Sequence, residues 1–520
     1  MKPIILFLFF LFIPACSPHE STRDTILTIA IESNPTSLDP RFSMDVVSAK
    51  ITGLVFNGLL RRDENMNLIP GLAEKWEVSD DTAYIFHLKR GIRFHDGREM
   101  TSRDVRYTFE SILDPANKSP KRGGYDMIKE IRTPDDHTVI FVLKKPFAPF
   151  LENMTLGIVP EHSAREKGAD FSGHPIGTGP FIFKEWRQDE GVTLASNKGY
   201  FEVSPRIAGI VYKIIPDETI RVLELKKGNV QLLMNPLTPD ILPLFEKNLE
   251  FKVVKKIGTN YSYIGLNLKD KILKNIKVRQ AIAHAIDRDS ICKYILKGLA
   301  KKTEGILTQY NWAYEPDLKG YDYNPELSKR LLDEAGYRVS QETGIRFRLT
   351  FKTSQNELRK RVAEVFQEQL RKVGIEMDIR AYEWGTFFSD IKSGNFQIFS
   401  LTWVGISDPD IFYYMFHSSN LSPVGGNRVN YENPKVDLLL EEGRLTMSPT
   451  RRKEIYSNVQ KLISDDLPYI NLWHSVNIAL IRKNIEGFIL YPDEDMVSLK
   501  DVYFTENSYN SPSGFLKKIK

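Results

Sequence analysis

Between residues 345 and 401, strand-like and helix-like apolar patterns follow one another in an order that few folds accommodate. Apolar residues alternate over 345–351, repeat at helical spacing over 358–373, alternate again over 375–379, and form one more short run over 396–401. Strand, helix and strand in this order form a βαβ unit with parallel strands. We therefore predict an α/β fold, with Trp403 just past the last strand, at the edge where open α/β sheets bind ligands.

The first sixteen residues have the layout of a secretory signal peptide. Lys2 gives a positive start, residues 4–12 are apolar, and Ala15 precedes Cys16. This apolar run is shorter than the roughly 20 residues that a membrane-spanning helix needs. Cys16 after Ala15 resembles a bacterial lipobox, so we expect Cys16 to carry lipid and residues 17–25 to form a polar tether; in the alternative, Cys16 is incidental. Both interpretations predict export, to the periplasm or the outer face of the cytoplasmic membrane.

The length and composition of the remaining chain limit its class. About 500 residues follow the leader, more than one hydrophobic core usually organises, so we expect at least two lobes. No later apolar run is long enough to cross a membrane, which predicts a soluble mature chain. The formal net charge of +4, spread evenly, argues against a nucleic-acid partner. Besides Cys16 there is only Cys292, whose apolar helical surroundings favour a buried structural thiol over a nucleophile.

Further local patterns precede the βαβ unit in the sequence. Residues 84–94 alternate in two strands and end in the turn at 95–97, which predicts a small β-meander. Thr101 or Ser102 then has the character of a helix N-cap. Residues 277–296 carry apolar side chains at helical spacing and predict a helix.

Four segments of the chain share their residues, order and spacing with one family. They are residues 72–76 (LAEKW), 84–105 (YIFHLKRGIRFHDGREMTSRDV), 176–181 (IGTGPF) and 278–289 (VRQAIAHAIDRD). On these motifs the chain resembles the extracytoplasmic solute-binding proteins of peptide/nickel-type ABC importers, the family of dipeptide- and oligopeptide-binding proteins. The similarity extends from about residue 27 to residue 500.

The resemblance implies the α/β fold of a type II periplasmic binding protein, with two lobes and two hinge crossings. Lobe I would combine residues 26–258 with the returning segment and tail 477–520, and lobe II would be residues 262–476. Lobe I would carry an extra subdomain at about residues 60–170. The ligand would lie between the lobes and be enclosed when they close about the hinge.

The resemblance also implies positions that contact the ligand. Trp384 and Trp403 have the nineteen-residue separation of two tryptophans that line the peptide site of oligopeptide-binding relatives. The other positions implied in this way are Asn34, Tyr125, Asn235, and Tyr261 or Tyr263 beside the first crossing. Aromatic rings suit such a site because they supply contact area without requiring matched polar partners. For each tryptophan, a place in the core is the alternative.

One position departs from the family pattern. Peptide-binding relatives have an aspartate three residues past the second tryptophan, which pairs with the α-amino group of the ligand; here that position is Ile406. An ammonium group buried without a carboxylate costs several kcal/mol of desolvation. Asp408 is the candidate replacement. Alternatively, Asp408 is only the N-cap of a helix that has Pro409 at its first position.

Other classes of function find little support in the residues. An exported hydrolase or peptidase is the competing class, but the chain has no Gly-x-Ser-x-Gly motif. The Gly-rich turn at 177–180 lacks the Lys-Ser/Thr pair of a phosphate loop. Nickel is bound within the family, and only His417 and His474 fall near loops of the expected lobe II. We therefore predict no enzymatic activity, no metal and no cofactor.

These observations predict a lipid-anchored, monomeric binding protein that captures a peptide-like solute and delivers it to the permease subunits of an ABC importer. A second possibility keeps the fold and changes the ligand to a solute without a free amine. An amine-blocked or cell-wall-derived peptide, a metal chelate and haem are examples. Ile406 is the residue that favours this second possibility.

Overall fold

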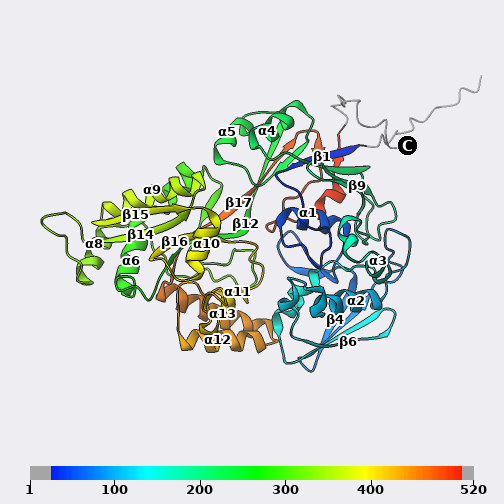
Figure 1. Cartoon of the computed structure of the whole chain (residues 1–520), viewed down its shortest axis with the longest axis horizontal. Helices are drawn as coiled ribbons and strands as arrows, with labels where there is room; N and C mark the ends of the chain where they lie inside the picture. Colours follow the sequence, from blue (N-terminus) through cyan, green and yellow to red (C-terminus); the bar gives the residue numbers. More distant parts are fainter. Residues whose placement is uncertain (1–24, 506–520) are drawn as a thin grey trace, which may run out of the picture.

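A computed structural model describes residues 25–505. Two lobes lie side by side and are joined by two long antiparallel strands, β12 (Phe251–Leu266) and β17 (Tyr469–Arg482) (Figure 1). Both strands belong to one 11-stranded sheet that passes through the two lobes. The mixed α/β architecture that the sequence predicts is confirmed.

The large sheet passes from lobe II to lobe I at its two central strands, β12 and β17. Its lobe II strands, from the edge inward, are β15 (Ile375–Tyr382), β14 (Phe347–Ser354) and β16 (Ile398–Trp403), followed by β12 and β17. Its lobe I strands continue as β11 (Leu232–Met234), β1 (Ile26–Ile31), β10 (Gly209–Ile214), β9 (Gly191–Ser196) and β8 (Phe181–Arg187). The short strand β13 (Ala300–Lys302) pairs with β17 beside this path.

The βαβ unit predicted over residues 345–401 is confirmed. β14 is parallel to both β15 and β16. The intervening helix α9 (Glu357–Arg371) buries an apolar face that includes Phe366 against the sheet. Trp403 is the last residue of β16, so it lies at the carboxyl edge of the parallel strands.

The helical pattern of residues 277–296 forms separate pieces rather than one helix. α6 (Ile276–Ala285) ends first, and α7 (Arg288–Ser290) follows and continues directly into the π-helical segment Ile291–Ile295. Asp287 separates them because its carboxylate accepts a hydrogen bond from the amide of Ser290 (2.9 Å), which starts a new helical turn. The other helices of this lobe are α8 (Pro325–Glu334), α10 (Trp384–Lys392), α11 (Ile411–Phe416), α12 (Pro434–Leu445) and α13 (Pro449–Asp466).

Lobe I contains a second, four-stranded antiparallel sheet with its own core. In spatial order its strands are β4 (Ala73–Ser79), β5 (Ala83–Leu88), β7 (Thr138–Leu143) and β6 (Ile128–Asp135). The helix α2 (Ser102–Leu113) packs on this sheet, and its N-cap is Thr101, one of the two residues expected there. The meander is shorter than predicted, because residues 92–94 form a single bridge to Glu99 instead of a strand.

Smaller elements complete lobe I. Its other α-helices are α1 (Val46–Val55), α3 (Glu161–Lys167), α4 (Glu218–Lys227) and α5 (Pro243–Glu246), and its 3₁₀ helices include η3 (Ala148–Thr155). Two short antiparallel pairs join β2 (Leu60–Arg62) to β3 (Leu68–Pro70) and β18 (Ile485–Glu486) to β19 (Tyr503–Phe504).

Two of the sequence motifs meet in lobe I. His95 accepts a hydrogen bond from the amide of Gly177 at Nδ1 (3.3 Å) and donates one from Nε2 to the carbonyl of Gly179 (3.0 Å). The amide of Gly179 donates to the carbonyl of Val55, at the end of α1 (2.8 Å). The turn at residues 176–181 therefore ties the four-stranded sheet to α1, which gives both motifs a structural role.

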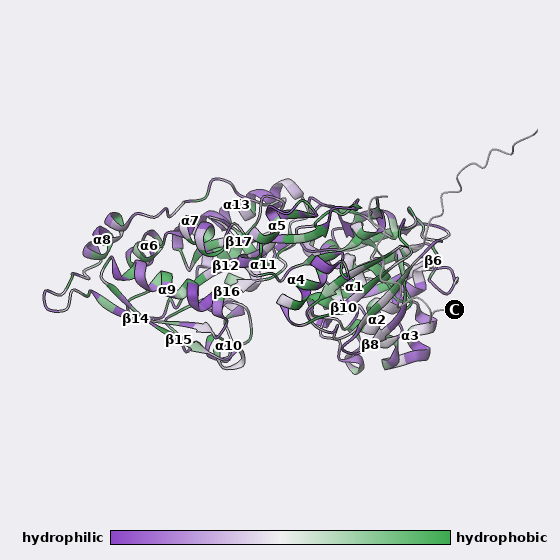
Figure 2. Ribbon diagram, turned by 90° about the horizontal axis from the view of Figure 1, so that it is seen from above, coloured by the Kyte–Doolittle hydropathy of each residue, from purple (hydrophilic) through white to green (hydrophobic). Residues whose placement is uncertain are grey.

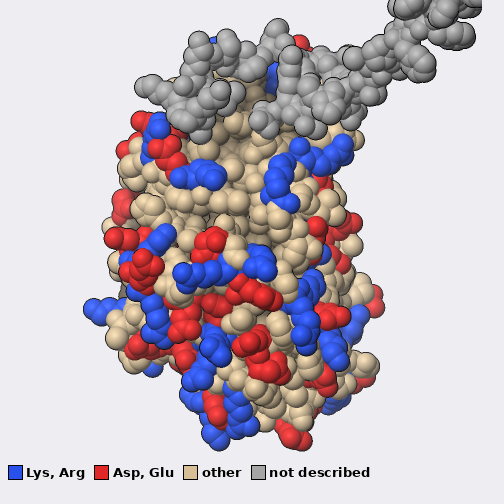
Figure 3. Space-filling model, turned by 90° about the vertical axis from the view of Figure 1, so that its right-hand side faces the viewer, with Lys and Arg blue, Asp and Glu red and all other residues tan. Residues whose placement is uncertain are grey.

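Apolar side chains fill the interior of each lobe, and charged ones cover the outside. Figure 2 shows hydrophobic strands inside and mainly hydrophilic outer helices such as α8 and α9. On the face of lobe I in Figure 3, basic and acidic side chains are interspersed. Cys292 is buried, and burial raises the pKa of its thiol to about 12, as expected for a structural cysteine. Within residues 25–505, no helix combines the length and the apolar character needed to cross a bilayer.

Candidate ligand-binding site

Aromatic side chains gather where β12, β16 and β17 lie side by side. Tyr261 is paired with Trp403 in the ladder between β12 and β16. Tyr263 stacks on Tyr469, with ring centroids 4.0 Å apart, and more loosely on Trp403, at 6.4 Å. The tyrosines are fully buried and Trp403 is partly exposed. The row of rings therefore begins in the core and reaches the surface at Trp403.

Arg428 lies against the exposed end of this row. Its guanidinium carbon is 4.1 Å from the centre of the Trp403 ring and 5.3 Å from that of Phe388. Its Nη1 donates a hydrogen bond to the hydroxyl of Tyr263 (3.2 Å). These contacts hold the plane of the guanidinium between two aromatic surfaces.

Trp384 extends the arrangement along α10. It is 50% exposed, and its ring stacks on Phe388 with centroids 5.6 Å apart and planes 8° apart. Arg359 of α9 lies over the Trp384 ring at 5.8 Å. Since Phe388 also contacts Arg428, rings and guanidinium groups form one series from Arg359 to Trp403. This series is called the aromatic wall here, and its elements, α10 and the end of β16, lie on the side of lobe II turned toward lobe I (Figures 1 and 2).

The segment after Trp403 returns to the core before α11 begins. Ile406 is 7% exposed and packs in the core of lobe II, so its side chain points away from the surface. The prediction of a cap at Asp408 was wrong by two residues: the N-cap is Asp410, and the helix begins at Ile411. The physical reason is that the Asp408 carboxylate accepts from the amide of Asp410 (2.8 Å) and forms a tight turn that precedes the helix.

Asp408 lies in a group of opposite charges between the lobes. Its Oδ1 is 3.7 Å from a guanidinium nitrogen of Arg452 on α13. On the lobe I side, Arg62 of β2 pairs with Glu152 of η3. Burial raises the pKa of Asp408, and Arg452 and Arg62 oppose that rise. Arginine side chains therefore already compensate the charge of this carboxylate.

Two of the predicted contact positions in lobe I hold loops together. Asn34 donates from Nδ2 to the carboxylate of Asp189 (2.6 Å) and accepts from the Asp189 amide (3.0 Å). Asn235 donates to the carboxylate of Glu494 (2.9 Å) and accepts from the amide of Ile478 (3.0 Å). Both side-chain amides are thus engaged within lobe I at donor and acceptor atoms.

Tyr125 lies in the core of the four-stranded sheet. It is 6% exposed, and its hydroxyl donates to the carbonyl of Asn153 (3.0 Å). Burial raises the pKa of this hydroxyl above its ordinary value, so it stays protonated and can donate. Of the predicted site residues, the structure brings together Tyr261, Tyr263, Trp384 and Trp403, and it places Asn34, Tyr125, Asn235 and Asp408 elsewhere.

Three members of the aromatic wall were missed by the sequence analysis. Phe388 follows Trp384 by four residues, a helical spacing that could have indicated a shared face. Arg359 lies on α9 and Arg428 lies in a loop without periodic pattern. No local signal distinguishes these arginines from the many others of the chain, because only tertiary packing brings them to the tryptophans.

The two histidines considered as nickel ligands make contacts of a different kind. His417 pairs with Glu441 (3.2 Å) and stacks on Tyr413. His474 is buried in β17 beside Tyr261, and burial lowers its pKa to about 4, which keeps it neutral. Within residues 25–505, no group of three or more His, Cys, Asp or Glu side chains is placed to hold a metal ion.

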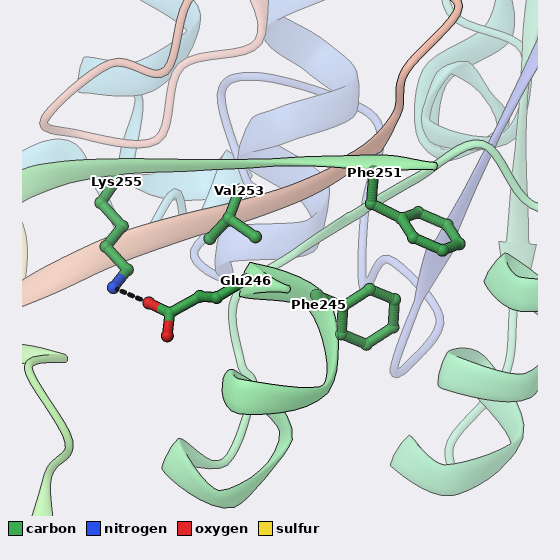
Figure 4. A pocket seen from close by; sticks show the side chains of 5 residues that line it. All are labelled: Phe245, Glu246, Phe251, Val253 and Lys255. Atoms are coloured by element: carbon green, nitrogen blue, oxygen red, sulfur yellow. Dashed lines mark hydrogen bonds and ion pairs between the residues drawn. The ribbon is translucent and has the colours of Figure 1, made fainter. Parts of the chain in front are cut away.

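Two cavities lie away from the aromatic wall. A hollow of about 400 Å³ lies between α5 and the start of β12, and an ion pair between Lys255 and Glu246 (2.7 Å) borders it (Figure 4). The other cavity, of about 20 Å³, is enclosed in lobe II beside Gln460 and Tyr469 and has room for about one water molecule. Neither is lined by a residue of the predicted site.

Comparison with known proteins identifies relatives over most of the chain. Residues 67–422 match the family described as bacterial extracellular solute-binding proteins, family 5 Middle. The oligopeptide-binding protein AppA of Bacillus subtilis (strain 168) is 31% identical, and the match covers 95% of this chain and 97% of AppA. The dipeptide-binding protein of Escherichia coli (strain K12) is 29% identical, with 91% and 93% covered.

Solved structures share the fold. AppA from Bacillus subtilis, in complex with a nonapeptide, superposes with a TM-score of 0.74 at 30% identity and covers 92% of this chain and 99% of its own. NikZ from Campylobacter jejuni, in complex with Ni(L-His), gives a TM-score of 0.77 at 27% identity, with 92% and 99% covered. The predicted fold class, a type II periplasmic binding protein, is therefore confirmed. The chain belongs to family 5 of the bacterial extracellular solute-binding proteins, the family of the peptide-binding proteins of ABC importers.

Proposed function

We propose that this protein captures peptide-like solutes between its two lobes and delivers them to the permease of an ABC importer, without breaking bonds in them. The aromatic wall carries this proposal, because Trp384 and Trp403 present ring surface on the side of lobe II turned toward lobe I. Stacked rings accept varied side chains without exact polar matching. The peptide ligands named for the AppA and Escherichia coli relatives support the choice of solute.

We place the hinge where β12 and β17 cross between the lobes. The register of β12 against β17 shifts between Ile257 and Tyr261, which interrupts the ladder of hydrogen bonds at that point. The proposed lobes are those expected from the sequence: residues 26–258 with 477–520, and residues 262–476, with the extra subdomain at about residues 60–170. A solute closes the lobes only if it binds the closed form better than the open form.

We further propose that the protein acts as a monomer at the membrane surface, anchored by lipid on Cys16 after export. Residues 1–24 lie outside the described part of the chain, so the proposal rests on the leader sequence. Replacement Cys16→Ser should move the exported protein from the membrane fraction to the soluble fraction, because no acyl chain then holds it. Cell fractionation measures this, with Cys292→Ser as the matched control. Cys16→Ser protein that still pellets with membranes would exclude the anchor.

A second candidate, a solute without a free amine, is favoured by one observation. Ile406 points into the core where peptide-binding relatives have an aspartate, and Asp408 faces Arg452. Asp408 as a replacement for that aspartate stays a prediction. A blocked peptide or a metal chelate would not need this carboxylate.

Native mass spectrometry of the exported protein, purified without denaturation, distinguishes the two candidates. A series of co-purified peptides with free amines supports peptide capture. A single species that is amine-blocked, metal-bound or not a peptide supports the second candidate. Protein that carries no small molecule and binds none of a set of random tri- to pentapeptides would refute peptide capture.

A further inference from the structure

Three cationic side chains border the aromatic wall. Arg359, Lys392 and Arg428 each lie over one of its rings, at 4.1 to 5.8 Å from a ring centre. None of the ion pairs formed among residues 25–505 includes any of these three side chains. The wall therefore carries positive charge that the described residues leave uncompensated.

Four acidic side chains of the segments that carry or follow the wall have other partners. They are Asp390 with Lys352 (2.6 Å), Asp408 with Arg452 (3.7 Å), Asp410 with Arg444 (2.9 Å), and Glu383, which accepts from the amide of Gly385 (2.7 Å) at the start of α10. Each of these carboxylates is thus held by its own partner on α10, β14, α12 or α13. Arg428 forms none of the ion pairs among residues 25–505, so an anion of the solute can pair with it.

The wall also has hydrogen-bond donors without acceptors. The Nη1 of Arg359 and the indole Nε1 of Trp403 are buried and find no acceptor among residues 25–505. Arg428 has one side-chain hydrogen bond, to Tyr263, although a guanidinium has five N–H donors. Two-oxygen acceptors satisfy such donors best, and a carboxylate pairs with a planar guanidinium through two parallel bonds. An ammonium group only donates, and like charges repel it from this surface.

From this arrangement we infer that the aromatic wall is a subsite for a carboxylate of the solute and that Arg428 selects it. The inference rests on the proposed capture of peptides and specifies their class: peptides that place a free C-terminal carboxylate, or an Asp or Glu side chain, against Trp403. Lobe closure removes water from the pair, which strengthens the preference for an anion over a neutral group.

The test uses the full chain, expressed with its leader, and two pools of random tri- to pentapeptides, one with free and one with amidated C-termini. Peptides retained with the protein through gel filtration are identified by mass spectrometry. The inference predicts that free-carboxyl peptides are retained at least about 10-fold better than amides, since a bond to a charged group has roughly this effect. Enrichment of Asp and Glu within the amidated pool would assign the carboxylate to a side chain instead.

Variants assign the selection to Arg428. Arg428→Gln should remove most of the preference, and Arg428→Lys should keep part of it, because the charge remains and the planar fork is lost. Arg359→Gln provides an independent test if Arg428→Gln does not fold, as judged by circular dichroism. The control is Arg371→Gln, on the same helix as Arg359 but paired with Glu368 at the surface. It should keep the full preference.

The outcomes separate the inference from the function it rests on. Equal retention of both pools without enrichment of Asp or Glu, or a preference unchanged in Arg428→Gln, would overturn the carboxylate subsite and leave peptide capture intact. Retention of neither pool would overturn both.

Discussion

At the scale of single residues, ring-bearing side chains differ in how far the fold itself uses them. Trp403 and Trp384 keep ring surface at the outside of lobe II, where guanidinium groups cover part of each ring. His95 is instead fixed between two backbone groups of a distant turn, as the acceptor of one hydrogen bond and the donor of another. The two tryptophan rings thus keep exposed surface, whereas the His95 ring is engaged entirely within the fold.

Replacement of Trp403 by Ala should weaken the binding of the peptide pools by about 10- to 100-fold, the range for a central aromatic contact residue. The fold should persist, because Trp403 is partly exposed and its indole N–H makes no hydrogen bond within the described residues. Isothermal titration measures the affinity, and Trp76→Ala, on β4 of lobe I, is the control. Unchanged affinity in Trp403→Ala would remove this residue from the site.

The protonation of His95 should make stability depend on pH. Burial lowers the pKa of His95 to about 4 in the folded protein, below the ordinary value of about 6.5 in the unfolded chain. Between these values the unfolded chain binds the extra proton, so the free energy of unfolding falls as pH decreases from about 6.5 to about 4, by at most about 1.4 kcal/mol per pH unit. Urea titrations of wild type and His95→Asn should differ by this slope. Parallel pH profiles of the two proteins would contradict the assignment.

At the scale of elements, the Gly-rich turn and α1 form one unit. A Cβ on Gly177 would lie 2.0 Å from the carbonyl oxygen of Val55, and one on Gly179 would lie 2.3 Å from that of Leu54. The turn approaches the end of α1 so closely that only glycine fits. This contact explains why the motif needs two glycines, which the sequence alone assigned only to turn geometry.

Gly177→Ala should therefore lower the free energy of unfolding by about 1–3 kcal/mol or more, because backbone must move to relieve the overlap. The matched control is Gly173→Ala, four residues earlier, where an added Cβ meets no atom within 4 Å. Urea denaturation followed by circular dichroism measures both. Equal stability of the two variants would show that the turn yields without cost.

At the scale of the whole molecule, the lobes touch at a second place besides the two crossing strands. Arg444 of α12 pairs with Asp410 (2.9 Å) and lies 5.0 Å over the ring of Phe147 in lobe I. The hydroxyl of Tyr84 reaches the sulfur of Met447 (3.7 Å). This contact links lobe II to the four-stranded sheet, so it bears on how readily the lobes separate.

Arg444→Ala should speed the release of bound peptide by about 2- to 5-fold, the effect of losing one cation–π contact of about 0.5–1 kcal/mol. Stopped-flow fluorescence measures the rate, and small-angle scattering should show a larger radius of gyration for the variant. Arg451→Ala, which removes an exposed arginine of α13, is the control. Release at the wild-type rate would mean that this contact does not hold the lobes together.

Elements with local signals could be predicted from the amino-acid sequence. The alternation and helical stripe over residues 345–379 predicted the βαβ unit, the adjacent cap-forming residues Thr101 and Ser102 predicted the start of α2, and four motifs predicted the family. Short-range backbone geometry and side-chain periodicity suffice for such features. The same local rules failed at Asp287, which divides the predicted helix, and at Asp408, whose turn precedes the cap of α11.

Which residues of the predicted site lie together depends instead on how distant elements pack. It joined Trp384 to Trp403 through Phe388 and Arg428, and it buried Tyr125 in a core of its own. No sequence period connects α9, α10, β16 and the loop at residue 428, because their contacts depend on how the sheet and its helices pack. The charge of the wall follows from the same packing, since it is set by which arginines find a carboxylate within reach and which find an aromatic ring.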